Sequence, residues 1–338
     1  MVNNSLDNIN KIQDFNSYAI SSFTVEENFS KKGELIRYHY TSAEALLSIL
    51  SERPELRFTD IHYMNDRSEM VYCVSCILKF LEKNRTDYSF FDKVVSALLL
   101  KRHSPDEYKN FSVSRVDFED NKIYPYLPTR SFVFCMSKSG DSLPMWNYYV
   151  RNNKYLGYNI AFDVYKFLKS FDTDKIKTAD PVIFKYGHVL YRENEQQKEV
   201  LKLAERIERD NQRKGETAIA HNMIFLRNYI ESYGAFFKHP AFKNEEEYRI
   251  VLVITNNRLL TSRENYYNNN LRKLRLDYCE RNGVLVPYMA VPINKDAFKK
   301  ITISPTIERE ISKQSLEDYL SQKNYNIEVK TSTIPIRF

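Results

Sequence analysis

Glu247-Tyr-Arg-Ile-Val-Leu-Val-Ile254 is the most strand-like stretch of this sequence, because β-branched and aromatic residues fill most of it. Two other stretches have a similar character. Ser131-Phe-Val-Phe-Cys-Met-Ser137 is almost wholly apolar, and Glu34-Leu-Ile-Arg-Tyr-His-Tyr-Thr41 alternates and is rich in aromatic residues. Together they predict a sheet, and Glu247, which opens the clearest strand, is expected at the rim of that sheet rather than on a loop.

Shorter elements around these three strands indicate the fold class. Further strands are predicted at 56–59, 157–162, 185–191, 284–291 and 301–304, and helices at 43–50, 70–84, 143–149 and 312–319. The sequence therefore predicts a single α+β domain over residues 34–320, with a mixed, mainly antiparallel central sheet. Helical inserts are expected at about 79–128 and 193–235, with an N-terminal lead-in over 1–33 and a C-terminal tail over 321–338.

Composition excludes several classes of protein. Hydrophobic residues make up 43% of the 338-residue chain, which is enough for a sizeable core and argues against wholesale disorder. There are only 7 glycines, and neither G-x-G-x-x-G nor G-x-x-x-x-G-K-[ST] occurs, so Rossmann and P-loop nucleotide sites are not expected. No apolar run approaches 18 residues and the N-terminus has no signal-peptide core, so we expect a cytoplasmic protein without membrane contact.

Charge and cysteine content set further expectations. A formal net charge of +6 permits a polyanionic partner without requiring one. Cys73 and Cys76 lie in an apolar, helix-like run without a second C-x-x-C or a nearby histidine pair. Buried structural cysteines are therefore favoured over a metal site, and no metal is expected. The charged helical segment 193–230 is either a surface for a partner or an ordinary solvated pair of helices.

The first group of candidate site residues lies on the strand 34–41. On a strand Arg37, His39 and Thr41 share one face, whereas Tyr38 and Tyr40 share the other. A histidine at the end of a strand, next to the start of a helix, is well placed to hydrogen-bond the ribose or amide of a ligand. Taken alone, a core histidine with satisfied hydrogen bonds is the simpler interpretation of His39.

The second group follows the strand that ends at Ser137. That strand leads into a glycine turn, and the next helix offers free backbone N–H groups and the positive end of its dipole, which attract anions such as a pyrophosphate. Trp146 and Tyr149 offer flat surfaces for stacking. The alternative is that Met145, Trp146 and Tyr149 form the core stripe of this helix, and both interpretations can hold together.

The third group opens the clearest strand. In an extended segment Glu245, Glu247 and Arg249 point the same way. A carboxylate at that rim can polarise a ribose hydroxyl or stabilise a developing oxocarbenium ion. The alternative is a solvated acidic turn with Arg249 as its local charge partner. Most runs of charged residues form solvated segments of this kind.

These motifs, in this order, resemble those of the bacterial domain-of-unknown-function 2971 family over about residues 35–320. The segments that carry the resemblance are Arg37-Tyr-His-Tyr-Thr-Ser42, Met64-Asn-Asp-Arg-Ser-Glu69, Phe134-Cys-Met-Ser137 with Asp141-Ser-Leu-Pro-Met-Trp146, Glu245-Glu-Glu-Tyr-Arg-Ile250, Gly283-Val-Leu-Val-Pro-Tyr288 and Ile301-Thr-Ile-Ser-Pro305. Two departures are Ser304, where glycine is expected before Pro305, and Met64, where leucine is usual.

The motif order of that family is in turn similar to that of ADP-ribosyltransferase folds, and this similarity implies roles for particular residues. It implies NAD as the substrate, with His39 and Tyr40 binding NAD, Ser137 supporting the pocket and Glu247 catalytic. Glu245 would be the upstream member of the E-x-E pair. Further pocket residues would be Trp146, Asn65, Asp66 and Arg249. The acceptor would be water or a macromolecule, protein or nucleic acid, as in an intracellular toxin or an anti-phage defence effector.

Two other functions remain open at this stage. One is a metal-dependent hydrolase acting on nucleic acid through Asp66, Glu69 and Glu247, which a chelator would inactivate. The other is a non-catalytic sensor module that binds a nucleotide in the same pocket. Turnover of NAD with release of nicotinamide, and its loss in His39→Ala and Glu247→Gln, would distinguish the ADP-ribosyltransferase from both.

Overall fold

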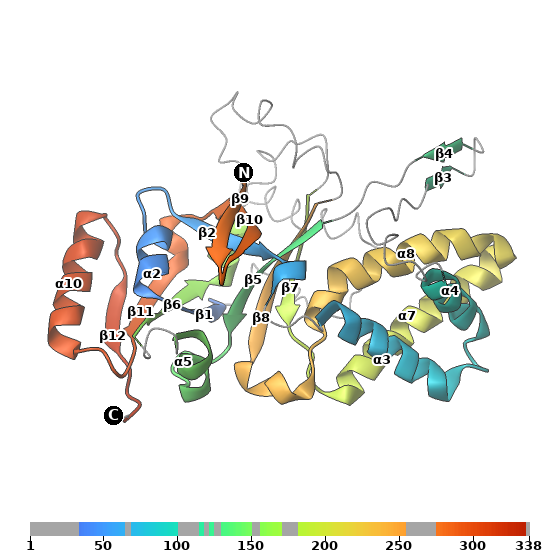
Figure 1. The fold of residues 1–338 in the computed structure, drawn as a ribbon, viewed down its shortest axis with the longest axis horizontal. Coiled ribbons are helices and arrows are strands. Elements are labelled where there is room, and N and C mark those ends of the chain that lie inside the picture. The colour runs from blue at the N-terminus through green and yellow to red at the C-terminus, as the bar shows by residue number, and fades with distance from the viewer. Residues whose placement is uncertain are drawn as a thin grey trace.

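A computed structural model of the chain describes residues 34–64, 69–100, 115–117, 122–124, 130–150, 156–170, 182–254 and 275–335, and it confirms the α+β class. Ten strands form one open sheet in the order β12-β11-β6-β1-β5-β2-β10-β9, with β8 paired to β5 and to β7 (Figure 1). Their bounds are β1 (Ile36–Thr41), β2 (Glu55–Asp60), β5 (Arg130–Ser137), β6 (Tyr158–Asp163), β7 (Val182–His188), β8 (Glu247–Ile254), β9 (Arg275–Arg281), β10 (Val284–Pro292), β11 (Phe298–Ile303) and β12 (Glu328–Thr331).

Pairing within the sheet is mainly antiparallel, as predicted. Among the described strands only β11 and β12 pair in parallel. A separate two-stranded sheet joins β3 (Arg115–Asp117) to β4 (Lys122–Tyr124). No helix in the described ranges combines the length and the apolar character that crossing a bilayer requires.

The helices are α2 (Ala43–Ile49), α3 (Glu69–Asn84), α4 (Ser89–Leu100), α5 (Leu143–Val150), α6 (Val164–Ser170), α7 (Glu193–Lys214), α8 (Ala218–Tyr233) and α10 (Arg309–Gln322). Short 3-10 turns are η1 (Ile61–Tyr63), η3 (Gly215–Thr217), η4 (Gly234–Phe236), η5 (Pro240–Glu245) and η6 (Lys295–Ala297). Figure 1 shows α3, α4, α7 and α8 together at one end of the molecule, and α2 and α10 at the other.

The two faces of the sheet bury different cores, because successive side chains of a strand point to opposite sides. On one side Phe134 and Ile250 pack with the apolar residues of α2, α6 and α10. On the other side Val133 and Val251 pack with those of α3, α4, α7 and α8. We call these sides the α2 face and the α8 face. The strands that carry these four residues, β5 and β8, are therefore buried on both sides, which explains their nearly continuous apolar sequence.

Strand register places Glu247 at the end of a row that crosses the sheet. Ser137 of β5 lies opposite Glu247 of β8, and Tyr38 of β1 lies opposite Ser137. Side chains that are directly opposite in antiparallel strands lie on the same side of the sheet. Glu247 and Val251 are separated by an even number of positions on β8, so both point to the same side. Glu247, Ser137 and Tyr38 therefore belong to the α8 face, at the rim where β8 begins.

The start of β6 depends on a residue without a side chain. A Cβ on Gly157 would lie 2.0 Å from Val150 Cγ1 and 2.6 Å from the carbonyl oxygen of Thr41. Such distances are far shorter than any van der Waals contact, so only glycine lets β6 begin this close to α5 and β1.

The C-terminal tail predicted over 321–338 contributes to the sheet, since β12 at Glu328–Thr331 pairs with β11. β9 and α6 were also not anticipated. In β9 no residue is buried, so this edge strand lacks the apolar alternation that identifies a strand.

Candidate functional site

The acidic segment before β8 forms a tight turn that directs two carboxylates to one place. η5 ends at Glu245, and Glu246 follows in the left-handed region, with φ of 43°, before β8 begins at Glu247. Ser137 Oγ donates to the Glu245 carbonyl at 2.8 Å, and the Lys138 amide donates to the Glu246 carbonyl at 2.9 Å. A left-handed residue with a side chain costs about 1–2 kcal/mol, and such strain is concentrated at functional sites.

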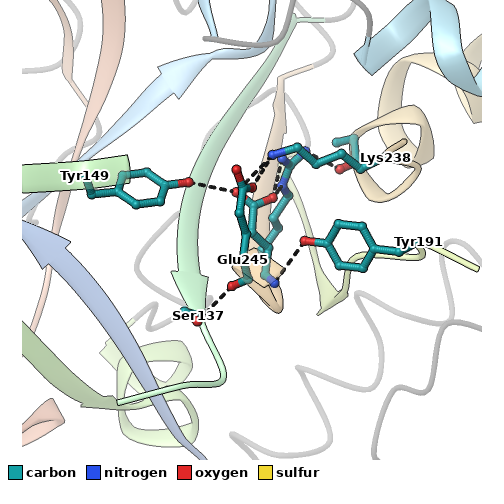
Figure 2. Close-up of polar contacts among 8 residues, drawn as sticks. Ser137, Tyr149, Tyr191, Lys238 and Glu245 are labelled. Atoms are coloured by element: carbon teal, nitrogen blue, oxygen red, sulfur yellow. Dashed lines mark hydrogen bonds and ion pairs between the residues drawn. The ribbon is translucent and has the colours of Figure 1, made fainter. Parts of the chain in front are cut away.

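Four charged side chains meet at this turn, and none of the four residues is more than 7% exposed (Figure 2). Arg249 contacts one oxygen of Glu247, Oε2, through Nε at 2.8 Å and Nη2 at 2.5 Å. Lys238 forms an ion pair with Glu245, and its Nζ lies 3.5 Å from the other oxygen of Glu247, Oε1. Lys238 therefore bridges the two carboxylates, and with both ionised the four charges cancel. We call these four residues the carboxylate cluster.

The two carboxyl groups have pKa values shifted in opposite directions. Burial, and next the negative charge of Glu247, raises the pKa of Glu245 to about 7 against the attraction of Lys238. Burial also acts to raise the pKa of Glu247, but the charges of Arg249 and Lys238 outweigh it and lower that pKa below its ordinary value. Near neutral pH Glu247 is ionised while Glu245 exchanges a proton, which is the division found in acid–base pairs.

Two tyrosine hydroxyl groups reach the acidic segment from opposite sides (Figure 2). Tyr149 of α5 donates to Glu247 Oε1 at 3.2 Å, and the Glu247 amide donates to the Tyr191 hydroxyl at 3.1 Å. Burial, and next the charge of Glu247, raises the pKa of both phenols well above the ordinary value, so both stay neutral. Tyr149 nevertheless exposes 37% of its surface, so its side chain lies between Glu247 and solvent.

The backbone at Lys238 is held by a side chain from the helical layer. Gln196 of α7 is 1% exposed, and its Nε2 donates to the carbonyl of Leu190 at 2.7 Å and to that of Lys238 at 3.0 Å. Its Oε1 accepts a hydrogen bond from the Tyr72 hydroxyl of α3 at 3.3 Å. Gln196 thus fixes the position from which the Lys238 side chain extends to the carboxylates.

Four of the predicted site residues come together here: Ser137, Glu245, Glu247 and Arg249. Ser137 is fully buried, and its Oγ also accepts a hydrogen bond from the Ser139 amide at 3.1 Å, so it shapes the turn. Arg249 is the charge partner of Glu247. The acidic turn is not solvated, however, because both glutamate side chains are buried.

Tyr40 and Trp146 lie against each other in a neighbouring apolar cluster. Their ring centroids are 4.7 Å apart in a T-shaped arrangement, and they are 4% and 0% exposed. The Tyr40 hydroxyl donates to the Ser139 carbonyl at 2.9 Å, and Trp146 Nε1 donates to Asp141 Oδ1 at 2.8 Å. Both residues therefore support the turn that follows β5, and neither presents an open ring for stacking.

His39 lies on the α2 face, so the structure does not bring it to Glu247. Its ring centroid is 4.7 Å from that of Phe134, and its Nδ1 donates to a backbone carbonyl of β5 at 2.9 Å. Burial lowers the pKa of His39, which favours the neutral imidazole. This separation follows from the alternation of side chains along a strand. Tyr38 is opposite Ser137 on the α8 face, so His39, the next residue of β1, points to the α2 face.

Two further predicted pocket residues, Asn65 and Asp66, lie outside the described residues. Within the described ranges, no group of three or more histidine, cysteine, aspartate or glutamate side chains is arranged to hold a metal ion. Cys73 and Cys76 are buried among the apolar residues of α3, and burial raises the pKa of both thiols. These are the properties of structural cysteines.

Sequence reasoning missed Lys238, Tyr191 and Gln196. A usable signal existed for Lys238, because it follows the apolar run Ala235-Phe-Phe237 directly and is therefore a cation next to buried residues. Tyr149 was expected to offer a flat surface, whereas its hydroxyl is the part that reaches the carboxylate cluster.

Comparison with known proteins bears on the family of this chain. No curated protein and no solved structure matched the chain. A family model did match, over a region that extends from α5 into β8 and includes Tyr149 and all four residues of the carboxylate cluster, but not Ser137. Over residues 145–250, the chain matches the model of the family described as Protein of unknown function (DUF2971).

Proposed function

We propose that this protein cleaves the bond between nicotinamide and ribose in NAD and passes the ADP-ribose to water or to a macromolecular acceptor. The observation that supports this most is that one buried lysine bridges two carboxylates whose pKa values are shifted apart. Cleavage of a glycosidic bond uses such a pair, because one carboxylate stabilises developing positive charge while the other handles a proton. The motif order described above points to NAD as the glycoside.

Glu247 is the charge-stabilising group in this proposal. As the C1′–N bond breaks, its electron pair leaves with the nicotinamide nitrogen, which becomes neutral, and positive charge develops on the ribose. An ionised carboxylate that is shielded from water stabilises such charge more strongly than one in bulk solvent. Glu247 is 2% exposed, and Arg249 and Lys238 keep it ionised in spite of its burial.

Glu245 is the proton acceptor. Water or an acceptor group attacks C1′ with a lone pair, forms the new bond and releases one proton, which Glu245 takes. A base works best when its pKa lies near the working pH, and the pKa of Glu245 is raised to about 7. Lys238 lies next to both carboxylates, so it screens the extra negative charge while Glu245 is ionised.

The other predicted residues have supporting roles in this proposal. Ser137 holds the acidic turn before β8, and Tyr40 and Trp146 hold the turn that follows β5. The contact of His39 with NAD remains a prediction of the family resemblance, and its place on the α2 face separates it from the reacting carboxylates.

The test is release of nicotinamide from NAD by the purified protein, measured by chromatography. Glu247→Gln removes the charge and keeps the shape, so we expect kcat to fall about 10²–10³-fold. Glu246→Gln is the matched control, because the side chain of Glu246 is exposed, and it should retain the activity. His39→Ala, measured in the same assay, tests the role that the resemblance implies for His39.

Three results would count against the proposal. Absence of nicotinamide release from the wild-type protein would refute the reaction. Equal rates in the wild type and in Glu247→Gln would refute the role of Glu247. Activity that disappears on adding a chelator would instead favour a metal-dependent hydrolase.

A further inference from the structure

Four donor atoms already face the Glu247 carboxylate, two at each oxygen. Two nitrogen atoms of Arg249 contact Oε2. Lys238 Nζ and the Tyr149 hydroxyl contact Oε1, at 3.5 Å and 3.2 Å. A carboxylate offers about four lone-pair positions, two on each oxygen. A ribose hydroxyl that approaches Oε1 therefore has to compete with the donors already there.

Tyr149 is the donor that can leave most easily. Arg249 and Lys238 are 0% and 5% exposed, and both are charged, so moving either would leave a buried ion without its partner. Arg249 Nη1 also donates to the Ala235 carbonyl at 2.5 Å. Tyr149 is neutral, and 37% of its surface is already in solvent. Rotation of its side chain removes one hydrogen bond and buries no charge.

We propose that the Tyr149 hydroxyl is a placeholder that competes with a hydroxyl group of the substrate for Glu247 Oε1. This inference rests on the proposed function and adds to it a form of self-inhibition. In the free protein Tyr149 satisfies the carboxylate and closes the approach to it. A ligand binds only by displacing that hydroxyl, so part of its binding energy is spent on opening the site.

Tyr149→Phe tests the competition, because it removes the hydroxyl and keeps the ring. Oε1 then has a free position, and a substrate hydroxyl gains a hydrogen bond to a charged group without losing another. We expect the Kd for NAD, measured by calorimetry, and the KM to fall about tenfold, with kcat little changed. Tyr148→Phe is the control, since this neighbour is 59% exposed, and it should behave as the wild type. An unchanged or weaker affinity in Tyr149→Phe overturns the competition.

A second measurement needs no substrate. Burial, and next the charge of Glu247, raises the pKa of Tyr149, so Glu247→Gln should lower the pKa of this phenol toward its ordinary value. NMR titration of ring-labelled tyrosine measures it, with Tyr149→Phe to assign the signal. A Tyr149 titration that is the same in both proteins overturns the contact itself. If the wild type and Tyr149→Phe both fail to bind NAD, the proposed function fails with the competition, whereas equal binding by both removes the competition alone.

Discussion

Glu245→Gln is the substitution that separates the two carboxylates most cleanly. The glutamine keeps the size and the hydrogen-bonding shape of the side chain but cannot ionise. Glu245 is 7% exposed, and its pKa is raised to about 7 from an ordinary 4.5, first by burial and then by Glu247. Lys238 retains its contact with Glu247 in the variant, so the cation between the carboxylates keeps one partner.

The sign of the pH effect follows from linkage between proton binding and folding. Below pH 4.5 Glu245 is protonated in both the folded and the unfolded protein. Between pH 4.5 and 7 the unfolded chain has lost this proton and the folded protein still holds it, so the free energy of unfolding falls as the pH rises. A shift of this size corresponds to about 3 kcal/mol, all of which is lost above the raised pKa. Glu245→Gln should therefore gain stability relative to the wild type by up to about 3 kcal/mol between pH 4.5 and 8.

Urea unfolding at pH 5, 6, 7 and 8 measures this difference, and the single, fully buried Trp146 provides the fluorescence signal. The difference between the two proteins reports Glu245 together with its effect on Glu247, because the remaining titrating groups are common to both. Glu246→Gln is the control and should follow the wild-type profile. A difference between Glu245→Gln and the wild type that stays constant within about 0.5 kcal/mol across this range would refute the assignment of a raised pKa to Glu245.

Three further single substitutions, one of them also combined with a second change, test the packing of the fold and the site by their effect on the free energy of unfolding. Arg249→Met leaves the buried Glu247 without its guanidinium and should cost about 3–5 kcal/mol, and adding Glu247→Leu should recover most of that loss; a single variant as stable as the wild type would contradict the pairing. Ser137→Ala removes the hydroxyl that donates to the acidic turn and should cost about 1–3 kcal/mol by urea unfolding, whereas no loss would mean that the turn is held by other contacts. Gly157→Ala places a methyl group 2.0 Å from Val150 Cγ1 and should lower thermal stability by about 1–3 kcal/mol, an expectation that an unchanged melting temperature would rule out.

The central strands were predictable from sequence because both of their sides are buried. β5 and β8 each lie between two apolar layers, and that environment produces the uninterrupted runs that identify them. β9 and β12 could not be found in this way. β9 buries no side chain and β12 buries only Val329, so neither carries an apolar pattern. Their place in the sheet comes from backbone hydrogen bonds, which leave little trace in composition.

The candidate site was predictable where residues share one strand or one turn. Glu245, Glu247 and Arg249 are two residues apart, so their common direction follows from local geometry alone. The relation of His39 to Glu247 depends instead on the register between strands far apart in the sequence. A slip of one residue exchanges the two faces of a strand, and the alternation around His39 does not show which strand it pairs with or in what register. The apolar run before Lys238 indicates a cation next to buried residues, but only the folded chain shows that the two carboxylates lie beside it.

The Gln196 contact makes the helical layer and the carboxylate cluster a single cooperative unit. One carboxamide holds the carbonyl groups of both Leu190 and Lys238, so partial melting of α7 releases the ammonium that neutralises the two acids. The acids would then repel each other, and the rim of the sheet would lose its order while its interior remained paired. Heat should therefore open the carboxylate cluster at a lower temperature than the one at which the central strands come apart.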